Sequence, residues 1–183
     1  MAAPANPSAQ PGTPTDPILV SIVDFVNTHH RKLWEIMEQK GGWEGWLQVE
    51  LAFLITESSA HAYVAERELN VFKKAGQRVD IWATGVQGPV QSVGIELKCE
   101  SHYQDNVGGA RLNARLSDDV EKILAGVRQE YVGTTGARVY AVGVTTNPND
   151  LKGYDKVASR GVQMQYKQTE SKQHWVLWWY KDF

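Results

Sequence analysis

The clearest periodic pattern in the sequence follows Gly108-Gly109, where apolar side chains recur every three or four residues. The stripe consists of Leu112, Leu116, Val120, Ile123, Leu124 and Val127. Such spacing predicts an amphipathic helix over 110–127. Two segments before it, 78–84 and 91–99, and one after it, 137–145, have the composition of strands. A helix placed between strands in this way predicts a sheet that helices cover.

Local signals place the remaining elements around this centre. Gly85 and Gly88-Pro89 suit a hairpin loop between the first two strands, and Asp16-Pro17 suits the start of a helix. The other expected elements are helices at 17–40 and 43–58, strands at 63–72, 164–166 and 174–180, and a short helix capped by Asn147-Pro148-Asn149-Asp150. The predicted order is α-α-β-β-β-α-β-α-β-β. The expected fold class is therefore α/β (α+β), with one central mixed sheet flanked by helices.

The length of 183 residues predicts one domain, 17–183, preceded by a flexible Pro/Ala-rich leader at 1–16. No stretch approaches the roughly 20 apolar residues that cross a bilayer, and the leader lacks the charged and apolar regions of a secretory signal. We therefore expect an intracellular protein, cytoplasmic or nuclear, with non-classical delivery left open. The single cysteine, Cys99, allows no internal disulfide.

Two neighbouring predicted strands carry charged residues with a spacing that favours chemistry. Residues two apart on a strand point to the same side, so Glu96 and Lys98 project together while Ile95 and Leu97 face the other way. If the two strands pair as a hairpin, Asp80 approaches Glu96. The alternative interpretation is a solvated charged hairpin.

A third carboxylate is predicted on the second helix. Glu50 has Trp46, Leu47, Phe53 and Leu54 as its helical neighbours, so we expect it on an apolar stripe. A carboxylate there is unfavourable unless a cation or a hydrogen-bond donor meets it. Carboxylates from two strands and a helix would form a hard-oxygen site suited to Mg²⁺ or Mn²⁺. Zinc is disfavoured because the sequence shows no His/Cys cluster.

This pattern resembles the PD-(D/E)XK nuclease superfamily, whose members carry a helix glutamate, a strand aspartate and (D/E)-x-K on the next strand. The matching positions are Glu50 in Gln48-Val49-Glu50-Leu51, Asp80 in Val79-Asp80-Ile81, and Glu96-Leu97-Lys98. The resemblance covers about 43–145 and implies a restriction-endonuclease-like fold with an αβββαβ core. Val79 replaces the proline of the family name.

The resemblance also implies an activity and roles for these residues. The chain would be an Mg²⁺-dependent endonuclease, with Mn²⁺ able to substitute, that leaves a 5′-phosphate. Asp80, Glu96 and the Leu97 carbonyl would hold the cation, and Glu50 would complete its shell. Lys98 would orient the attacking water or contact the phosphorus centre. DNA is the favoured substrate and RNA the alternative, and a homodimer is left open.

The formal net charge of −2 means that contact with phosphates must come from a local basic patch or a bound cation. Candidates for such a patch are Lys73, Lys74, Arg78, Arg111, Arg115 and Lys122, with His102 and Gln104 as further candidates after the E-x-K strand. A solvated helix face explains the residues of the 110–127 helix equally well.

Two other function classes compete with an active nuclease. A catalytically inactive nuclease-like domain could bind nucleic acid or a protein partner. The seven tryptophans suggest a carbohydrate-binding module, but long helices at 17–40 and 110–127 argue against that class. Within the nuclease interpretation, a toxin or effector domain and a restriction or repair enzyme both remain open.

Overall fold

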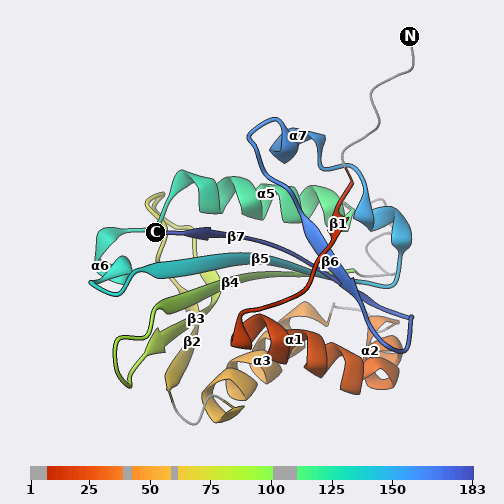
Figure 1. Ribbon diagram of the computed structural model, residues 1–183, viewed down its shortest axis with the longest axis horizontal. Helices are drawn as coiled ribbons and strands as arrows, with labels where there is room; N and C mark the ends of the chain where they lie inside the picture. The colour runs from red at the N-terminus through yellow and green to blue at the C-terminus, as the bar shows by residue number, and fades with distance from the viewer. Residues whose placement is uncertain (1–7, 39–42, 59–61, 101–110) are drawn as a thin grey trace.

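Seven strands form one mixed sheet in the order β1-β6-β7-β5-β4-β3-β2 (Figure 1). The computed structural model describes residues 8–38, 43–58, 62–100 and 111–183. The strands are β1 (Gln10–Pro11), β2 (Tyr63–Leu69), β3 (Val79–Gly85), β4 (Ser92–Cys99), β5 (Ala137–Thr145), β6 (Gln165–Gln168) and β7 (Trp175–Asp182). The chain is thus a mixed α/β protein, as the sequence predicts.

Helices cover both faces of this sheet, α1, α2 and α3 on one and α5 and α7 on the other (Figure 1). The helices are α1 (Pro17–Thr28), α2 (His30–Met37), α3 (Glu44–Ser58), α5 (Leu112–Ala125), α6 (Gln129–Val132) and α7 (Asp155–Ala158), with a 3₁₀ turn, η1 (Pro148–Leu151). None of the described helices is long and apolar enough to cross a membrane.

The centre of the sheet confirms the predicted hairpin between the strands at 78–84 and 91–99. β2, β3 and β4 are antiparallel neighbours, with Ile81 opposite Ile95. β4 and β5 are parallel, so the chain must cross between them, and α5 lies in that crossover. The described elements between Glu44 and Thr145 therefore occur in the order α3, β2, β3, β4, α5, α6, β5, which contains the predicted αβββαβ order.

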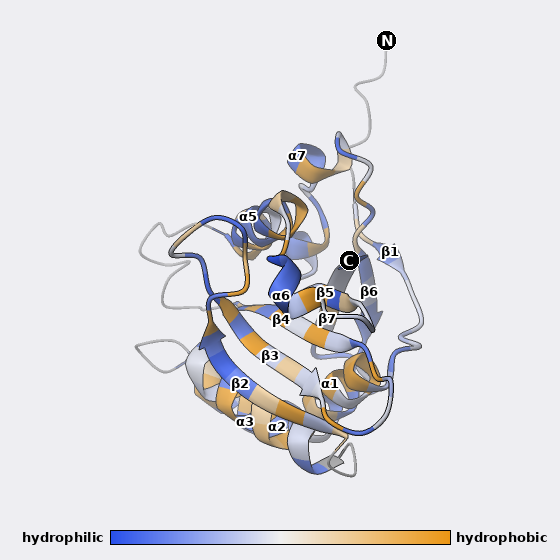
Figure 2. Cartoon of the chain, turned by 90° about the vertical axis from the view of Figure 1, so that its left-hand side faces the viewer, coloured by the Kyte–Doolittle hydropathy of each residue, from blue (hydrophilic) through white to orange (hydrophobic). Residues whose placement is uncertain are grey.

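Alternation along the strands divides the core into two layers. Ile81, Ile95 and Leu97 pack with α1, α2 and α3, whereas Trp82 packs with α5. Glu96 and Lys98 alternate with Ile95 and Leu97, so they lie on the α5 face of the sheet. Figure 2 shows apolar residues along the central strands, whereas the edge strand β2 carries a hydrophilic stretch that contains Glu66, Arg67 and Glu68. Charged edges of this kind discourage pairing with other chains.

The first predicted helix is wrong in one respect, because 17–40 contains two helices that meet at His29. The backbone of His29 leaves the helical range (φ −101°, ψ 15°). Its ring stacks on Phe25 with centroids 4.2 Å apart, and its Nδ1 lies 2.9 Å from the Phe25 carbonyl oxygen. Neither proline nor glycine marks this break, so the sequence gives no ordinary helix-breaking signal there.

The predicted leader is also wrong for the part of it that the structure describes. Gln10–Pro11 forms β1, which pairs in parallel with β6. The Ala9 side chain is buried, and the Gln10 N–H donates to the Met164 carbonyl at 2.9 Å. Proline fits here because an edge strand leaves one side without hydrogen bonds. Residues 1–7 lie outside the described residues.

Candidate active site

The β3–β4 pair brings together the three strand residues that the sequence singles out. The β3–β4 register ends at the Ile81–Ile95 pair, and Asp80 and Glu96 are the next residues on the two strands. The Asp80 side chain accepts a hydrogen bond from the backbone of β4, since its Oδ2 lies 2.7 Å from the Leu97 N–H donor. Lys98 Nζ lies 3.5 Å from the same oxygen. Lys98 therefore contacts Asp80, and the Asp80 charge acts on Glu96 on the same face of the sheet.

The Lys98 ammonium group lies among three carboxylates. Its Nζ lies 3.1 Å from Glu44 Oε1, 3.4 Å from Asp119 Oδ2 and 3.5 Å from Asp80 Oδ2, and it donates to the Leu97 carbonyl at 2.8 Å. Burial opposes the charge, but Asp119, Asp80 and Glu44 outweigh it and raise the pKa of Lys98 above its usual range. Lys98 is therefore a cation at neutral pH and cannot accept a proton there.

Glu96 is the most deeply buried acid of this cluster, with 1% of its surface exposed. Oε2 accepts a hydrogen bond of 2.7 Å from Lys122 Nζ, but Oε1 is buried and has no hydrogen-bond partner in the described part of the chain. Burial, followed by the charges of Asp119 and Asp80, raises the pKa of Glu96 well above its usual value despite Lys122. Within the described residues, Oε1 of this carboxylate thus has no hydrogen-bond donor, and Lys122 is the lysine that compensates the charge through Oε2.

Helix α5 contributes three charged residues to the cluster, Arg115, Asp119 and Lys122. Their spacing of four and three residues places them on one face of the helix, toward β4. Burial raises the pKa of Asp119 to about 6, although Lys98 lowers it. The buried Asp119 Oδ2 lies near Lys98 Nζ but makes no hydrogen bond of good geometry.

Helix α3 contributes Glu44 from its first turn. In addition to Lys98, its carboxylate accepts the Cys99 N–H at 3.0 Å and a longer bond from Arg115 at 3.4 Å. Arg115 also donates to the Cys99 carbonyl at 2.6 Å. Glu44 and Arg115 therefore fix the end of β4 between α3 and α5.

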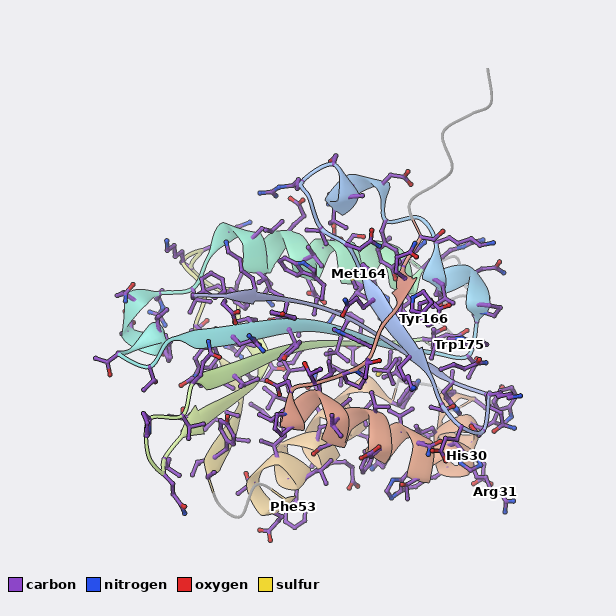
Figure 3. All side chains as sticks on the ribbon, viewed as in Figure 1. His30, Arg31, Phe53, Met164, Tyr166 and Trp175 are labelled. Atoms are coloured by element: carbon purple, nitrogen blue, oxygen red, sulfur yellow. The ribbon has the colours of Figure 1, made fainter. Side chains whose placement is uncertain are left out.

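The predicted position of Glu50 at the site is corrected by this arrangement. The buried side of α3 contains Leu47, Gln48, Leu51 and Ile55, and Glu50 lies off it, half-buried. Phe53, expected beside Glu50 on the apolar stripe, is 66% exposed and points away from the body of the protein (Figure 3). Six residues separate Glu44 from Glu50, which amounts to about 9 Å along a helix and a different direction around it. Glu44, and not Glu50, is the α3 carboxylate that contacts Lys98.

The predicted basic patch divides into two groups. Arg115 and Lys122 are engaged in the ion pairs with Glu44 and Glu96, whereas Lys73, Lys74, Arg78 and Arg111 are exposed. The other two predicted contacts, His102 and Gln104, lie outside the described residues. Four of the six described candidates are thus exposed, and the other two are held in ion pairs.

The oxygen atoms of this cluster are of the chemical kind that binds a hard divalent cation. Within the described ranges, no group of three or more His, Cys, Asp or Glu side chains is arranged to hold a metal ion, and two lysine amines lie among the acids instead. Asp80, Glu96 and the Leu97 carbonyl nevertheless supply the oxygen ligands that Mg²⁺ prefers. Glu96 Oε1, which has no partner in the described part of the chain, is an atom that such a cation would satisfy.

Two members of the cluster, Glu44 and Asp119, are absent from the sequence-based prediction. Asp119 lies three residues after Leu116 and four before Ile123, so it borders the apolar stripe of its helix. Glu44 lies three residues before Leu47 and seven before Leu51, which are buried positions of its own helix. An acid beside an apolar stripe was the signal used for Glu50, and it applies equally to these two.

No family model, no curated protein and no solved structure matches this chain. Function must therefore be argued from the cluster itself.

Proposed function

We propose that this chain is a metal-dependent nuclease that hydrolyses phosphodiester bonds, with DNA as the favoured substrate and RNA as the alternative. The single observation that supports this most is the group formed by Asp80, Glu96 and Lys98 on one face of β3 and β4, in which Lys98 contacts Asp80 and the buried Glu96 Oε1 has no donor among the described residues. We further propose a restriction-endonuclease-like fold of the PD-(D/E)XK superfamily, which the αβββαβ order supports. Action on DNA favours a cytoplasmic or nuclear setting.

Asp80, Glu96 and the Leu97 carbonyl would hold Mg²⁺ or Mn²⁺. When bound, the cation would lower the pKa of a coordinated water and stabilise the negative charge that develops on the phosphate. Glu96 is the strongest candidate ligand because its buried Oε1 has no hydrogen-bond partner among the residues that the structure describes. Asp80 supplies a second carboxylate, held in orientation by the Leu97 N–H.

Lys98 acts as a cation in this proposal. Its raised pKa removes it as a general base at neutral pH, so it contacts the phosphate or orients the attacking water through its N–H donors. Glu44 and Asp119 are positioning residues because they hold the Lys98 amine from two sides at 3.1 and 3.4 Å. Hydrolysis would leave a 5′-phosphate.

A second candidate function is a catalytically inactive nuclease-like domain that binds nucleic acid. The observation that favours it is the neutralisation of the acids by lysines. Lys122 pairs with Glu96 at 2.7 Å, and Lys98 lies within 3.5 Å of three other carboxylates. A cluster balanced in this way can be a structural network with no need of a metal.

Incubation of the purified protein with linear, circular and single-stranded DNA and with RNA separates the two candidates. Each substrate is tested with Mg²⁺, with Mn²⁺ and with EDTA. Cutting that requires the metal supports the nuclease, and the set of substrates cut identifies the nucleic acid. Binding without cutting in any metal supports the inactive domain. Cutting that persists in EDTA contradicts a metal-dependent site.

A further inference from the structure

A basic hollow lies beside the candidate active site, between the loop of residues 70–78 and the beginning of α6. It has a volume of about 250 Å³, and Phe72, Lys73, Lys74, Gly76 and Arg128 are among the residues that line it. Both lysines are exposed and Arg128 is half-buried. Among the described residues that line the hollow, three are cationic and none is acidic. Its charge therefore suits an anion.

Backbone contacts hold the loop against the end of α5. The Lys73 N–H donates to the Gly126 carbonyl at 3.0 Å, and the Arg128 N–H donates to the Val71 carbonyl at 2.8 Å. Between these bonds, Phe72 and Val127 form an antiparallel bridge. Figure 2 shows this loop rising from the ends of β2 and β3 toward α5 and α6. The three cations are thus presented by a fixed piece of backbone.

The Lys73 side chain is held as well. It lies over Gly126, where an added Cβ atom would come within 3.2 Å of Lys73 Cδ and 3.4 Å of Nζ. Gly126 has φ +105°, a conformation that favours glycine. The absence of a side chain at Gly126 therefore makes the space in which the Lys73 amine lies.

Arg128 is oriented by several neighbours. Its guanidinium group donates to the Asn70 carbonyl and to the Tyr131 hydroxyl, and it lies 5.0 Å from the centre of the Tyr131 ring. Its ion pair with Glu130 is largely exposed, so solvent screens that pairing. The buried Nε has no hydrogen-bond partner among the described residues. Arg128 therefore retains its positive charge for a ligand in the hollow.

One lysine connects the hollow to the carboxylate cluster. Lys122 Nζ lies 4.8 Å from the centre of the Phe72 ring, which lines the hollow. The same Nζ donates to Glu96 Oε2 at 2.7 Å. The hollow and the most buried acid of the candidate site are thus linked through a single side chain.

We propose that this hollow, lined by Lys73, Lys74 and Arg128, binds a backbone phosphate of the nucleic-acid strand next to the phosphate that is cut. This inference rests on the proposed nuclease function and gives it a substrate-positioning site. Phosphates are bound by Lys and Arg side chains together with backbone N–H groups. A chain with a net charge of −2 needs such a local site to hold a polyanion.

The test is binding of a short fluorescein-labelled single-stranded oligodeoxynucleotide, measured by anisotropy in EDTA so that no cutting occurs. The variant is Lys73→Gln with Lys74→Gln. The matched control is Lys167→Gln with Lys172→Gln, which removes two exposed lysines from the β6–β7 hairpin in the other half of the sheet. We expect the Lys73/Lys74 variant to bind about 10-fold more weakly at about 50 mM salt and to show a salt slope smaller by up to about 2.

The control should bind like the wild type. Equal weakening in both variants, or no detectable binding by the wild type, overturns the inference. Because the assay does not depend on cutting, the two proposals can fail separately. If the wild type cuts and the Lys73/Lys74 variant binds and cuts equally well, the phosphate-binding role of the hollow is wrong and the nuclease proposal stands. If the wild type never cuts but the Lys73/Lys74 variant alone loses binding, the nuclease proposal is wrong and phosphate binding in the hollow is supported.

Discussion

Lys98 of β4 and Glu44 of α3 are joined by a hydrogen bond of 3.1 Å between Nζ and Oε1, across 54 residues of sequence. The same glutamate accepts the N–H of the next residue, Cys99. One carboxylate therefore fixes both the charged side chain and the backbone at the end of β4. The position of the candidate site depends on this contact between a helix and a strand.

Replacement of Lys98 by methionine should destabilise the protein in the absence of metal. The change leaves Glu44, Asp80 and Asp119 close together without the cation that now separates them, and loss of one partner of a buried ion pair costs about 3 kcal/mol of unfolding free energy. Urea denaturation in EDTA and in Mg²⁺ measures this. We expect Mg²⁺ to restore part of the loss, because a ligand that binds the folded state stabilises it. A variant that is equally unstable with and without Mg²⁺ would show that these acids do not form a cation site.

Replacement of Glu44 by glutamine should have a larger effect than the same change at Glu50. Glu44→Gln weakens the charge-assisted bonds to Lys98 and Arg115, and we expect a loss of about 1–3 kcal/mol in unfolding free energy. Glu50→Gln is the matched control on the same helix and should change stability by less than about 0.5 kcal/mol. Denaturation curves of the two variants decide between them. Equal losses of unfolding free energy in the two variants would contradict the assignment of Glu44, in place of Glu50, to the site.

The sequence is informative about the strand part of the site because a strand has a fixed alternation. The two-residue period puts Glu96 and Lys98 on one side whatever the rest of the fold does. The helix acid is less certain, since α3 has apolar residues on several sides and Phe53, which suggested a buried stripe, is exposed. Which side of that helix meets the sheet is decided by tertiary packing.

The buried His174 should make the protein sensitive to acid. Burial lowers the pKa of His174 to about 4 from its usual 6.5, and His30 adds to this effect. As the pH falls from about 6.5 to 4, the unfolded chain takes up a proton that the folded chain refuses, so up to about 3 kcal/mol of stability is lost. His174→Leu removes this titration. The difference in unfolding free energy between His174→Leu and the wild type should therefore grow as the pH falls, and a constant difference would contradict the prediction.

His174→Leu should not destabilise the protein at pH 7. Neither ring nitrogen of His174 has a hydrogen-bond partner within the described residues, and a buried polar group without a partner costs about 1–3 kcal/mol. We expect the variant to be as stable as the wild type or more stable by about 1 kcal/mol in chemical denaturation. A clear loss of stability at pH 7 would mean that the ring nitrogens have partners after all.

Gly94 should be intolerant of even a small side chain, since β4 meets Trp82 there. A Cβ at Gly94 would lie 2.9 Å from Trp82 Cζ3 and 3.2 Å from Val139 Cγ1. We expect Gly94→Ala to lower the unfolding free energy by about 1–3 kcal/mol. Gly45→Ala is the control, because a Cβ there meets nothing within 4 Å and alanine favours the helix. Thermal unfolding should lower Tm in the first variant and leave it unchanged or higher in the second.

The break at His29 and the strand β1 illustrate what local patterns miss. The apolar residues of α1 and α2 continue at helical spacing across His29, so the sequence shows no interruption. The residues of β1 have the composition of a linker, and they form a strand because they pair with β6. Both features depend on partners that are distant in sequence, whereas the hairpin and α5 depend on local periodicity.

The most direct test of the central claim is the rate of DNA cutting at saturating Mg²⁺ by four purified proteins and the wild type. Three carry Asp80→Asn, Glu96→Gln or Lys98→Met, and the fourth carries Glu50→Gln as a control outside the cluster. We predict that the first three lose about 100-fold or more in rate and that Glu50→Gln cuts like the wild type. Equal rates in all five proteins would show that the cluster of Asp80, Glu96 and Lys98 is not the catalytic centre.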